Sequence, residues 1–160
     1  MGRVQKELRQ TVPFKTTAQE AMVALMRTAD LVRRQIAAVL EPHDVTLQQY
    51  NVLRILRGGG ADGVPTLEVA ARMIEQTPGI TRLLDRLEAK GLVKRERCPK
   101  DRRQHLCWIT PAGSDLLRAL DAPLLAAGEQ ILQGLNNDDR IAFIRLLDAI
   151  RGAHDTNEQS

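Results

Sequence analysis

The chain has 160 residues, of which 43% are hydrophobic and 2% aromatic, and its net charge is +3. This hydrophobic content excludes wholesale disorder, and without a run of about eighteen apolar residues no membrane span is expected. The N-terminus lacks the apolar core of a secretory signal, and two cysteines cannot form a disulfide framework, so a cytoplasmic location is expected.

The positive charge is concentrated in one segment. Residues 77–105 contain nine Lys/Arg and four Asp/Glu, a net charge of +5, which leaves −2 for the other residues. Such a basic patch is suited to nucleic acid, an acidic protein or an anionic membrane.

The N-terminal half of the chain shows two helical patterns. Residues 1–16 are polar and basic and predict an arm. Apolar residues then recur at spacings of three and four up to Pro42, which predicts a long helix. Thr46 and Gln49 have the spacing of a capping box at the start of a second helix. The glycine-rich stretch 58–65 ends this helix and is interpreted as a plain turn, since the lysine of a phosphate-binding loop is missing.

Two further helices are predicted before residue 92. Thr66 is expected to cap a short helix whose inward-facing residues are Leu67, Ala70 and Ile74. Thr77 and Pro78 are expected to be the N-cap and first residue of the next helix, which Gly91 ends. Its apolar stripe consists of Ile80, Leu83, Leu84 and Leu87. Its other face carries small, hydroxylated and charged residues, namely Thr77, Gly79, Thr81, Arg82, Asp85 and Arg86.

The C-terminal half begins with two strand-like runs, LVKRERC and HLCWIT, separated by the polar turn PKDRRQ. They predict a β-hairpin with a basic tip. A long helix is predicted over 111–135, with a kink at Pro123, and a last helix over 138–151, with Asn137 as its cap.

The order of helix, short helix, helix and hairpin is typical of a winged helix-turn-helix. The predicted fold is therefore mainly α with a small β-hairpin, with the DNA-binding domain at 43–110. The helices in 17–42 and 111–152 carry more apolar surface than this domain can cover, so they are predicted to form a dimerisation region. Residues 1–16 are assigned to a basic arm and 153–160 to a frayed tail.

The helix beginning near Pro78 is predicted to enter the major groove, where Arg82 reaches a guanine edge or a phosphate. The hairpin tip is predicted to reach a neighbouring minor groove or phosphates. The candidate DNA-binding residues are Thr77, Gly79, Thr81, Arg82, Arg86, Lys100, Asp101, Arg102 and Arg103.

The run TPGITRLLDRLEAKGLVKRERCPKDRRQHLCWITPAG resembles the MarR family of bacterial transcription regulators, and the weaker helical patterns extend the resemblance over roughly residues 16–152. The resemblance implies a homodimer that binds a pseudo-palindromic operator on double-stranded DNA. Such a homodimer is usually a repressor of a nearby operon, and a small ligand or oxidation releases it from the operator. It also implies that Arg103 lies in the minor groove and that Asp101 holds it in place.

The effector is less well indicated. Many family members bind aromatic acids in a crevice beside the DNA-binding lobe, and His43 and Tyr50 are the candidate ligand-binding residues. Relatives that sense oxidants use a cysteine near the N-terminus, which this chain lacks. Cys98 and Cys107 are expected to be structural, and the hairpin register places them on different strands but not directly opposite.

Other chemistry finds little support. The chain shows no catalytic constellation, so no enzyme activity and no cofactor are expected. Cys98, His105 and Cys107 lack the spacing of a closed zinc site, so no metal is expected. The alternative function is a helical interaction module whose basic face binds an acidic partner. A salt-sensitive, sequence-selective gel shift separates the two, because only the regulator discriminates between duplexes.

Overall fold

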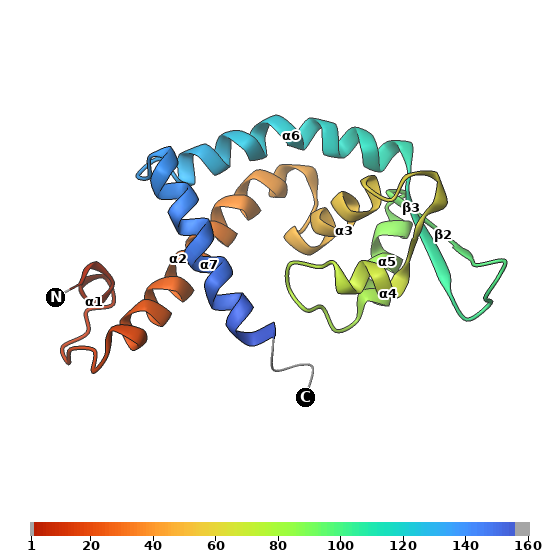
Figure 1. Cartoon of the computed structure of the whole chain (residues 1–160). Helices are drawn as coiled ribbons and strands as arrows, with labels where there is room; N and C mark the ends of the chain where they lie inside the picture. Colours follow the sequence, from red (N-terminus) through yellow and green to blue (C-terminus); the bar gives the residue numbers. More distant parts are fainter. Residues whose placement is uncertain (1, 156–160) are drawn as a thin grey trace. The chain divides into compact units, whose positions relative to one another are not determined.

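The structure is a computed structural model that describes residues 2–155. The chain is mainly helical with one small antiparallel sheet (Figure 1). The elements, with η for 3₁₀ helices, are α1 (Arg3–Glu7), α2 (Thr17–Leu40), η1 (Glu41–His43), α3 (Leu47–Arg57), η2 (Gly60–Asp62), β1 (Val64–Pro65), α4 (Thr66–Ala71), α5 (Ile80–Ala89), β2 (Val93–Arg97), β3 (His105–Ile109), α6 (Pro111–Ile131) and α7 (Asn137–Asp155). The chain divides into two compact units, one ending at Leu124 and the other beginning at Leu125, within α6.

The first unit contains the winged helix-turn-helix that the order of elements predicts. Helices α3, α4 and α5 precede the hairpin of β2 and β3, whose connecting loop projects away from these helices in Figure 1. The sheet has the order β1-β3-β2, so the hairpin gains a third strand that was not predicted. The glycine-rich stretch, interpreted as a plain turn, contains β1, where Val64 pairs with Cys107. A strand of two residues is too short to show the alternation on which strand prediction depends.

The core of this unit is aliphatic. Leu53 of α3, Val69 of α4, Leu84 and Leu87 of α5 and Leu117 of α6 are all fully buried in one cluster. Burying an aliphatic side chain of this size contributes about 1.5–3 kcal/mol to folding. The same cluster includes one buried residue from each strand of the hairpin, so the core joins α5 and the base of the hairpin in one body.

Local signals set the ends of several helices as predicted. Thr46 Oγ1 accepts a hydrogen bond from the Gln49 backbone N–H at 3.1 Å, and Gln49 Oε1 accepts one from the Thr46 N–H at 3.2 Å, which confirms the capping box. Gly91, at φ +71°, ends α5. Its N–H bonds to the Glu88 carbonyl and the Leu92 N–H to the Leu87 carbonyl, the pattern of a Schellman motif.

Helix α4 differs from its prediction. Thr66 does not cap it; its hydroxyl donates to the His105 carbonyl at 3.3 Å. Leu67 and Ile74 are exposed rather than inward-facing, whereas Val69 is fully buried. The helix ends at Ala71, so the helical spacing that linked Ile74 to the other residues does not hold beyond that point.

The ends of the chain bring further differences. The predicted arm contains the short helix α1. Helix α6 continues through Pro123 but stops at Ile131, not 135. The Arg140 guanidinium donates hydrogen bonds to the backbone carbonyls of Leu132 and Leu135 in the turn that follows α6.

The last helix begins one residue before its predicted start, at Asn137, and its cap is Asn136 rather than Asn137, because Asn136 Oδ1 accepts a hydrogen bond from the Asp139 N–H at 2.9 Å. Of the predicted tail, residues 153–155 belong to α7, and 156–160 lie outside the described residues. Within 2–155, no helix has the length and apolarity needed to cross a membrane.

Candidate nucleic-acid interface

Helix α5 presents one buried and one exposed face. Leu83, Leu84 and Leu87 are buried against the core, while Arg82 and Arg86 are exposed on the other side. The start of the helix was predicted wrongly. It begins at Ile80, after Gly79 in the left-handed region at φ +90°, and Thr77 and Pro78 lie in the preceding turn. Thr77 Oγ1 donates to the Glu75 carbonyl and so does not cap α5.

A surface hollow of about 410 Å³ lies at the beginning of α5. Four of the predicted site residues line it together: Thr77, Gly79, Arg82 and Arg86. Gln48, on the exposed side of α3, lines it too and was missed by the sequence analysis. Its amide offers donors and an acceptor beside two guanidinium groups. The only sequence signal for Gln48 was its polarity among the apolar positions of α3.

The loop between β2 and β3 holds the other predicted residues, Lys100, Asp101, Arg102 and Arg103, all of which are exposed. Asp101 organises this loop. Its Oδ1 accepts a hydrogen bond from the Arg103 backbone N–H at 3.0 Å, and its carbonyl accepts one from the Gln104 N–H at 3.0 Å. Asp101 therefore orients the backbone at Arg103, and in this structure its bond is not to the guanidinium.

The four acids of the basic segment are all engaged. Asp85 and Glu88 pair with Arg95, Glu96 pairs with Lys94, and Asp101 bonds to the loop backbone. Six cations of the segment make no ion pair among residues 2–155, namely Arg82, Arg86, Arg97, Lys100, Arg102 and Arg103. The available positive charge thus lies at two places, the exposed face of α5 and the hairpin.

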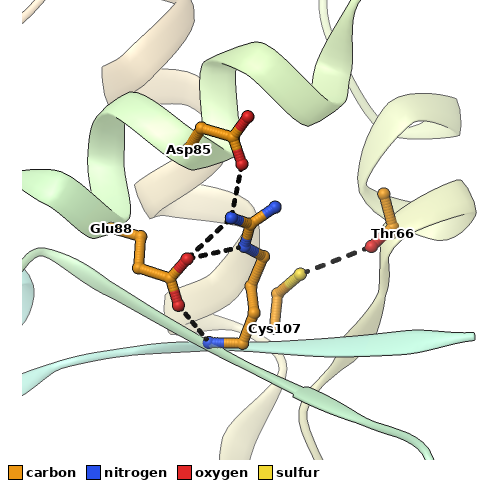
Figure 2. Close-up of polar contacts among 5 residues, drawn as sticks. Thr66, Asp85, Glu88 and Cys107 are labelled. Atoms are coloured by element: carbon orange, nitrogen blue, oxygen red, sulfur yellow. Dashed lines mark hydrogen bonds and ion pairs between the residues drawn. The ribbon is translucent and has the colours of Figure 1, made fainter.

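Arg95 has a role that the sequence analysis missed. From β2 it points toward α5, where its Nη2 lies 2.5 Å from Asp85 Oδ1 and 2.6 Å from Glu88 Oε2 (Figure 2). Burial alone would lower the pKa of this guanidinium, but hydrogen bonds and charge from Glu88 and Asp85 outweigh it and raise the pKa above its usual value. The contact crosses the turn at Gly91, so no helical or strand spacing could have shown it.

A larger cavity of about 550 Å³ lies in the first unit, between the end of α2 and the start of α3. Its charged lining residues are Arg34, Glu41, Asp44 and Lys90. Lys90 Nζ lies 3.2 Å from Asp44 Oδ2, which ties the end of α5 to the segment before α3. The predicted ligand residues do not line this cavity: His43 is exposed in η1, and half-buried Tyr50 packs against the core.

The two cysteines are free thiols. Cys98 is half-buried and lies just after β2, whereas Cys107 is fully buried and lies on β3 opposite Arg95. The prediction that they are not directly opposite is confirmed, but Cys98 does not lie on a strand. Burial raises the pKa of the Cys107 thiol, and its sulfur lies 3.7 Å from Thr66 Oγ1. In the described part of the chain, no three His, Cys, Asp or Glu side chains gather in a way that would hold a metal ion.

Comparison with known proteins gives a consistent result. The model of the MarR family matches residues 43–104. The chain is 31% identical to the HTH-type transcriptional regulator TtmR of Methylorubrum extorquens (strain PA1) over 80% of this chain and 64% of TtmR, so the match spans less than two thirds of that relative. It is 30% identical to the transcriptional regulator HosA of Escherichia coli O111:H- over 65% of this chain and 76% of HosA.

A solved structure shares the fold. It is that of BpsR from Bordetella bronchiseptica, described as showing a mechanism for regulation of DNA binding by 6-hydroxynicotinic acid. The TM-score is 0.73 at 25% identity, over 82% of this chain and 98% of BpsR. The fold and the family match thus agree with the sequence resemblance.

Proposed function

The chain belongs to the MarR family of DNA-binding transcription regulators, and from this premise we propose that it acts as a homodimeric repressor of a nearby operon, released from its operator by a small ligand. The observation that carries the proposal is the division of unpaired positive charge between the exposed face of α5 and the hairpin. A duplex offers two features at matching positions, a major groove wide enough for a helix and an adjacent minor groove.

In this proposal the two basic surfaces read different information. Arg82 and Arg86 project from α5 into the major groove, where a guanidinium distinguishes guanine by its two acceptors. The flanking residues Thr77, Gly79 and Thr81 let the backbone approach the DNA closely. The hairpin loop, with Lys100, Arg102 and Arg103, enters the minor groove, whose base pattern is degenerate. Its contribution is therefore mainly affinity and shape preference.

The proposed dimer rests on apolar surface that the chain leaves exposed. Met22 and Met26 on α2 and Ile141 and Ile144 on α7 are all more than half exposed. A twofold axis between two copies would cover such faces and place the two α5 helices about 34 Å apart, one turn of DNA. The operator would then be a pseudo-palindrome.

The proposed effector site is the cavity between α2 and α3. Its cations, Arg34 and Lys90, suit a small molecule with a carboxylate, and the regulation of BpsR by an aromatic acid supports this ligand class. A ligand that binds to Lys90 competes with Asp44 for its ammonium. Ligand binding would thereby act on the residue that follows α5.

The experiment compares two substitutions on two duplexes by fluorescence anisotropy. The first duplex is selected from a random-sequence pool with the wild-type protein, and the second is an unrelated duplex of the same length. Arg82→Ala should cost about 1–3 kcal/mol on the selected duplex and less on the unrelated one. Arg103→Ala should weaken both by similar factors and lower the slope of log affinity against log salt by about one for each phosphate contact removed.

Arg118→Ala is the matched control, because Arg118 is an exposed arginine of α6 that pairs with Asp115, outside the proposed interface. It should leave both affinities and the salt slope near those of the wild type. If neither Arg82→Ala nor Arg103→Ala changes affinity or salt slope, the proposed groove-reading roles are wrong, and the basic segment serves an acidic partner instead.

A further inference from the structure

The base of the hairpin is attached to the rest of the first unit on both of its faces. Arg95 and Cys107 pair across β2 and β3, as do Lys94 and Trp108. Because neighbouring positions along a strand point to opposite faces, the two pairs lie on opposite sides of the sheet. Neither pair belongs to the loop proposed to contact DNA.

On the first face, Arg95 binds α5 through several contacts. Its Nε lies 3.1 Å from Glu88 Oε2, and its Nη2 contacts both Glu88 and Asp85 (Figure 2). The Arg95 backbone N–H also donates to Glu88 Oε1 at 3.3 Å. Only 18% of the Arg95 side chain is exposed. A planar guanidinium with fixed donors holds two carboxylates in one geometry, which a flexible ammonium does not.

On the second face, Trp108 rests on the turn before β1. Its Nε1 donates to the Ala61 carbonyl at 2.9 Å, and Lys94 Nζ lies 5.9 Å from the centre of its ring. The hairpin is thus held between α5 on one side and the segment 61–63 on the other. These contacts leave its base little freedom to rotate relative to α5.

The charges around Arg95 also bear on DNA binding. Asp85 and Glu88 lie on α5 and are 55% and 41% exposed, so unpaired they would repel a phosphate backbone near Arg82 and Arg86. Arg95 neutralises them from the side of the sheet. Its own charge is consequently engaged within the protein rather than with DNA.

We propose that Arg95 is a positioning residue for DNA recognition: by binding Asp85 and Glu88 it fixes the angle between α5 and the hairpin, so that both basic surfaces engage one duplex at the same time. This inference rests on the proposed DNA interface, because it assumes that α5 and the hairpin loop both touch DNA. It makes the contribution of the hairpin loop depend on Arg95, a residue that does not itself contact the duplex.

The test is a double-mutant cycle that measures how much Arg103 contributes with and without the Arg95 contacts. The affinity loss caused by Arg103→Ala is measured on the selected duplex in the wild-type and Arg95→Gln backgrounds. A loss of about tenfold in the wild type should shrink to less than about threefold in Arg95→Gln, because a misplaced hairpin no longer brings Arg103 to the groove. The loss caused by Arg82→Ala should stay the same in both backgrounds.

Two further backgrounds separate position from charge and keep the test open if Arg95→Gln fails to fold. Arg95→Lys retains the charge but not the fork, so the contribution of Arg103 should be restored only in part. Asp85→Asn combined with Glu88→Gln removes two negative charges near the DNA. Electrostatics alone would then strengthen binding and leave the Arg103→Ala loss intact, whereas loss of positioning reduces it.

Arg57→Gln is the matched control. Arg57 Nη1 pairs with Asp121 at 3.0 Å between α3 and α6, the same kind of ion pair away from the hairpin. The Arg103→Ala loss should remain tenfold there. The affinities are compared at a temperature at which circular dichroism shows that every variant is folded.

Each outcome decides between the proposals. An equal Arg103→Ala loss in the wild type, in Arg95→Gln and in the double variant Asp85→Asn with Glu88→Gln would mean that Arg95 only stabilises the fold. The inference would then be wrong while the DNA interface stands. If Arg103→Ala has no effect even in the wild type, the hairpin does not contact DNA, and both proposals fail at that surface.

Discussion

The apolar side chains of the winged helix-turn-helix are buried within its own unit, whereas those of the long helices near the chain ends are largely not buried. From α3 to the start of α6, nearly every helix buries leucine or valine completely within its own unit. Helix α2 buries only Leu40, and α7 buries none of its described residues. The first region is stable through its own contacts, whereas the apolar faces of α2 and α7 call for another surface, which we assign to a second copy of the chain.

The largest expected effect is on the self-contained region. Leu84→Ala removes a fully buried side chain at the centre of the core and should lower the free energy of unfolding by about 2–5 kcal/mol. Urea denaturation followed by circular dichroism measures this change. Leu67→Ala is the control, because Leu67 is 74% exposed and its loss should change stability by less than about 0.5 kcal/mol. Similar losses for the two variants would contradict the buried and exposed assignments within this region.

The second prediction concerns the exposed faces. Ile144→Asp places a charge on the apolar face of α7 and should dissociate the proposed dimer, because a buried unpaired carboxylate is costly at an interface. Sedimentation velocity at micromolar concentration measures the shift from dimer to monomer.

The control for this substitution is Ala149→Asp, which adds the same charge on another side of α7 and should leave the dimer intact. A wild-type protein that sediments as a monomer would refute the dimer itself. Dissociation by both variants would show that charge, rather than the Ile144 face, is responsible.

The sequence predicted those parts of the fold that local interactions determine. The capping box at Thr46, the buried stripe of Leu83, Leu84 and Leu87, and the turn at Gly91 each depend on residues within one or two helical turns. The exposed positions of Arg82 and Arg86 follow from the same periodicity.

The rest depends on contacts between distant residues. Strand β1 exists because Val64 pairs with Cys107, and the Arg95 side chain is placed by Asp85 across a turn. The beginning of α5 was missed for a different reason. Thr77 and Pro78 are residues that favour a helix start, yet the left-handed Gly79 ends the preceding turn two residues later. The local preferences of Thr77 and Pro78 show only that they could begin a helix, and the backbone conformation of Gly79 determines that α5 begins after it.

The third prediction tests how tightly the self-contained region is packed beside the hairpin. Gly63 has φ +74°, and a Cβ there would lie 2.6 Å from Trp108 Cε2. Gly63→Ala should therefore both strain the backbone and displace Trp108, and together these effects should lower the free energy of unfolding by about 2–4 kcal/mol. Gly60 has φ +60° with nothing within 4 Å of its Cβ position, so Gly60→Ala should cost only the strain, about 1–2 kcal/mol.

Trp108 is the only tryptophan of the chain, so its fluorescence reports on this site alone. Its emission should shift to longer wavelength in Gly63→Ala and stay unchanged in Gly60→Ala. Equal stability losses with unchanged emission in both variants would mean that the turn changes its backbone conformation without displacing Trp108.

The smallest effect concerns the two thiols, which probe how completely the self-contained region is closed. Cys107 is fully buried and burial raises the pKa of its thiol, so it stays protonated at neutral pH and should not react with iodoacetamide in the folded protein. Half-buried Cys98 should react first, and Cys107 only when the core opens. Mass spectrometry of the labelled peptides measures the reaction rates of the two thiols. Because the pKa of Cys107 is higher in the folded than in the unfolded chain, its contribution to stability is complete below the ordinary thiol pKa and declines as pH rises through the raised pKa.

Mild peroxide should leave the affinity for DNA unchanged. Loss of binding on peroxide treatment that a thiol reductant reverses, and that Cys98→Ser abolishes, would instead make Cys98 a redox sensor.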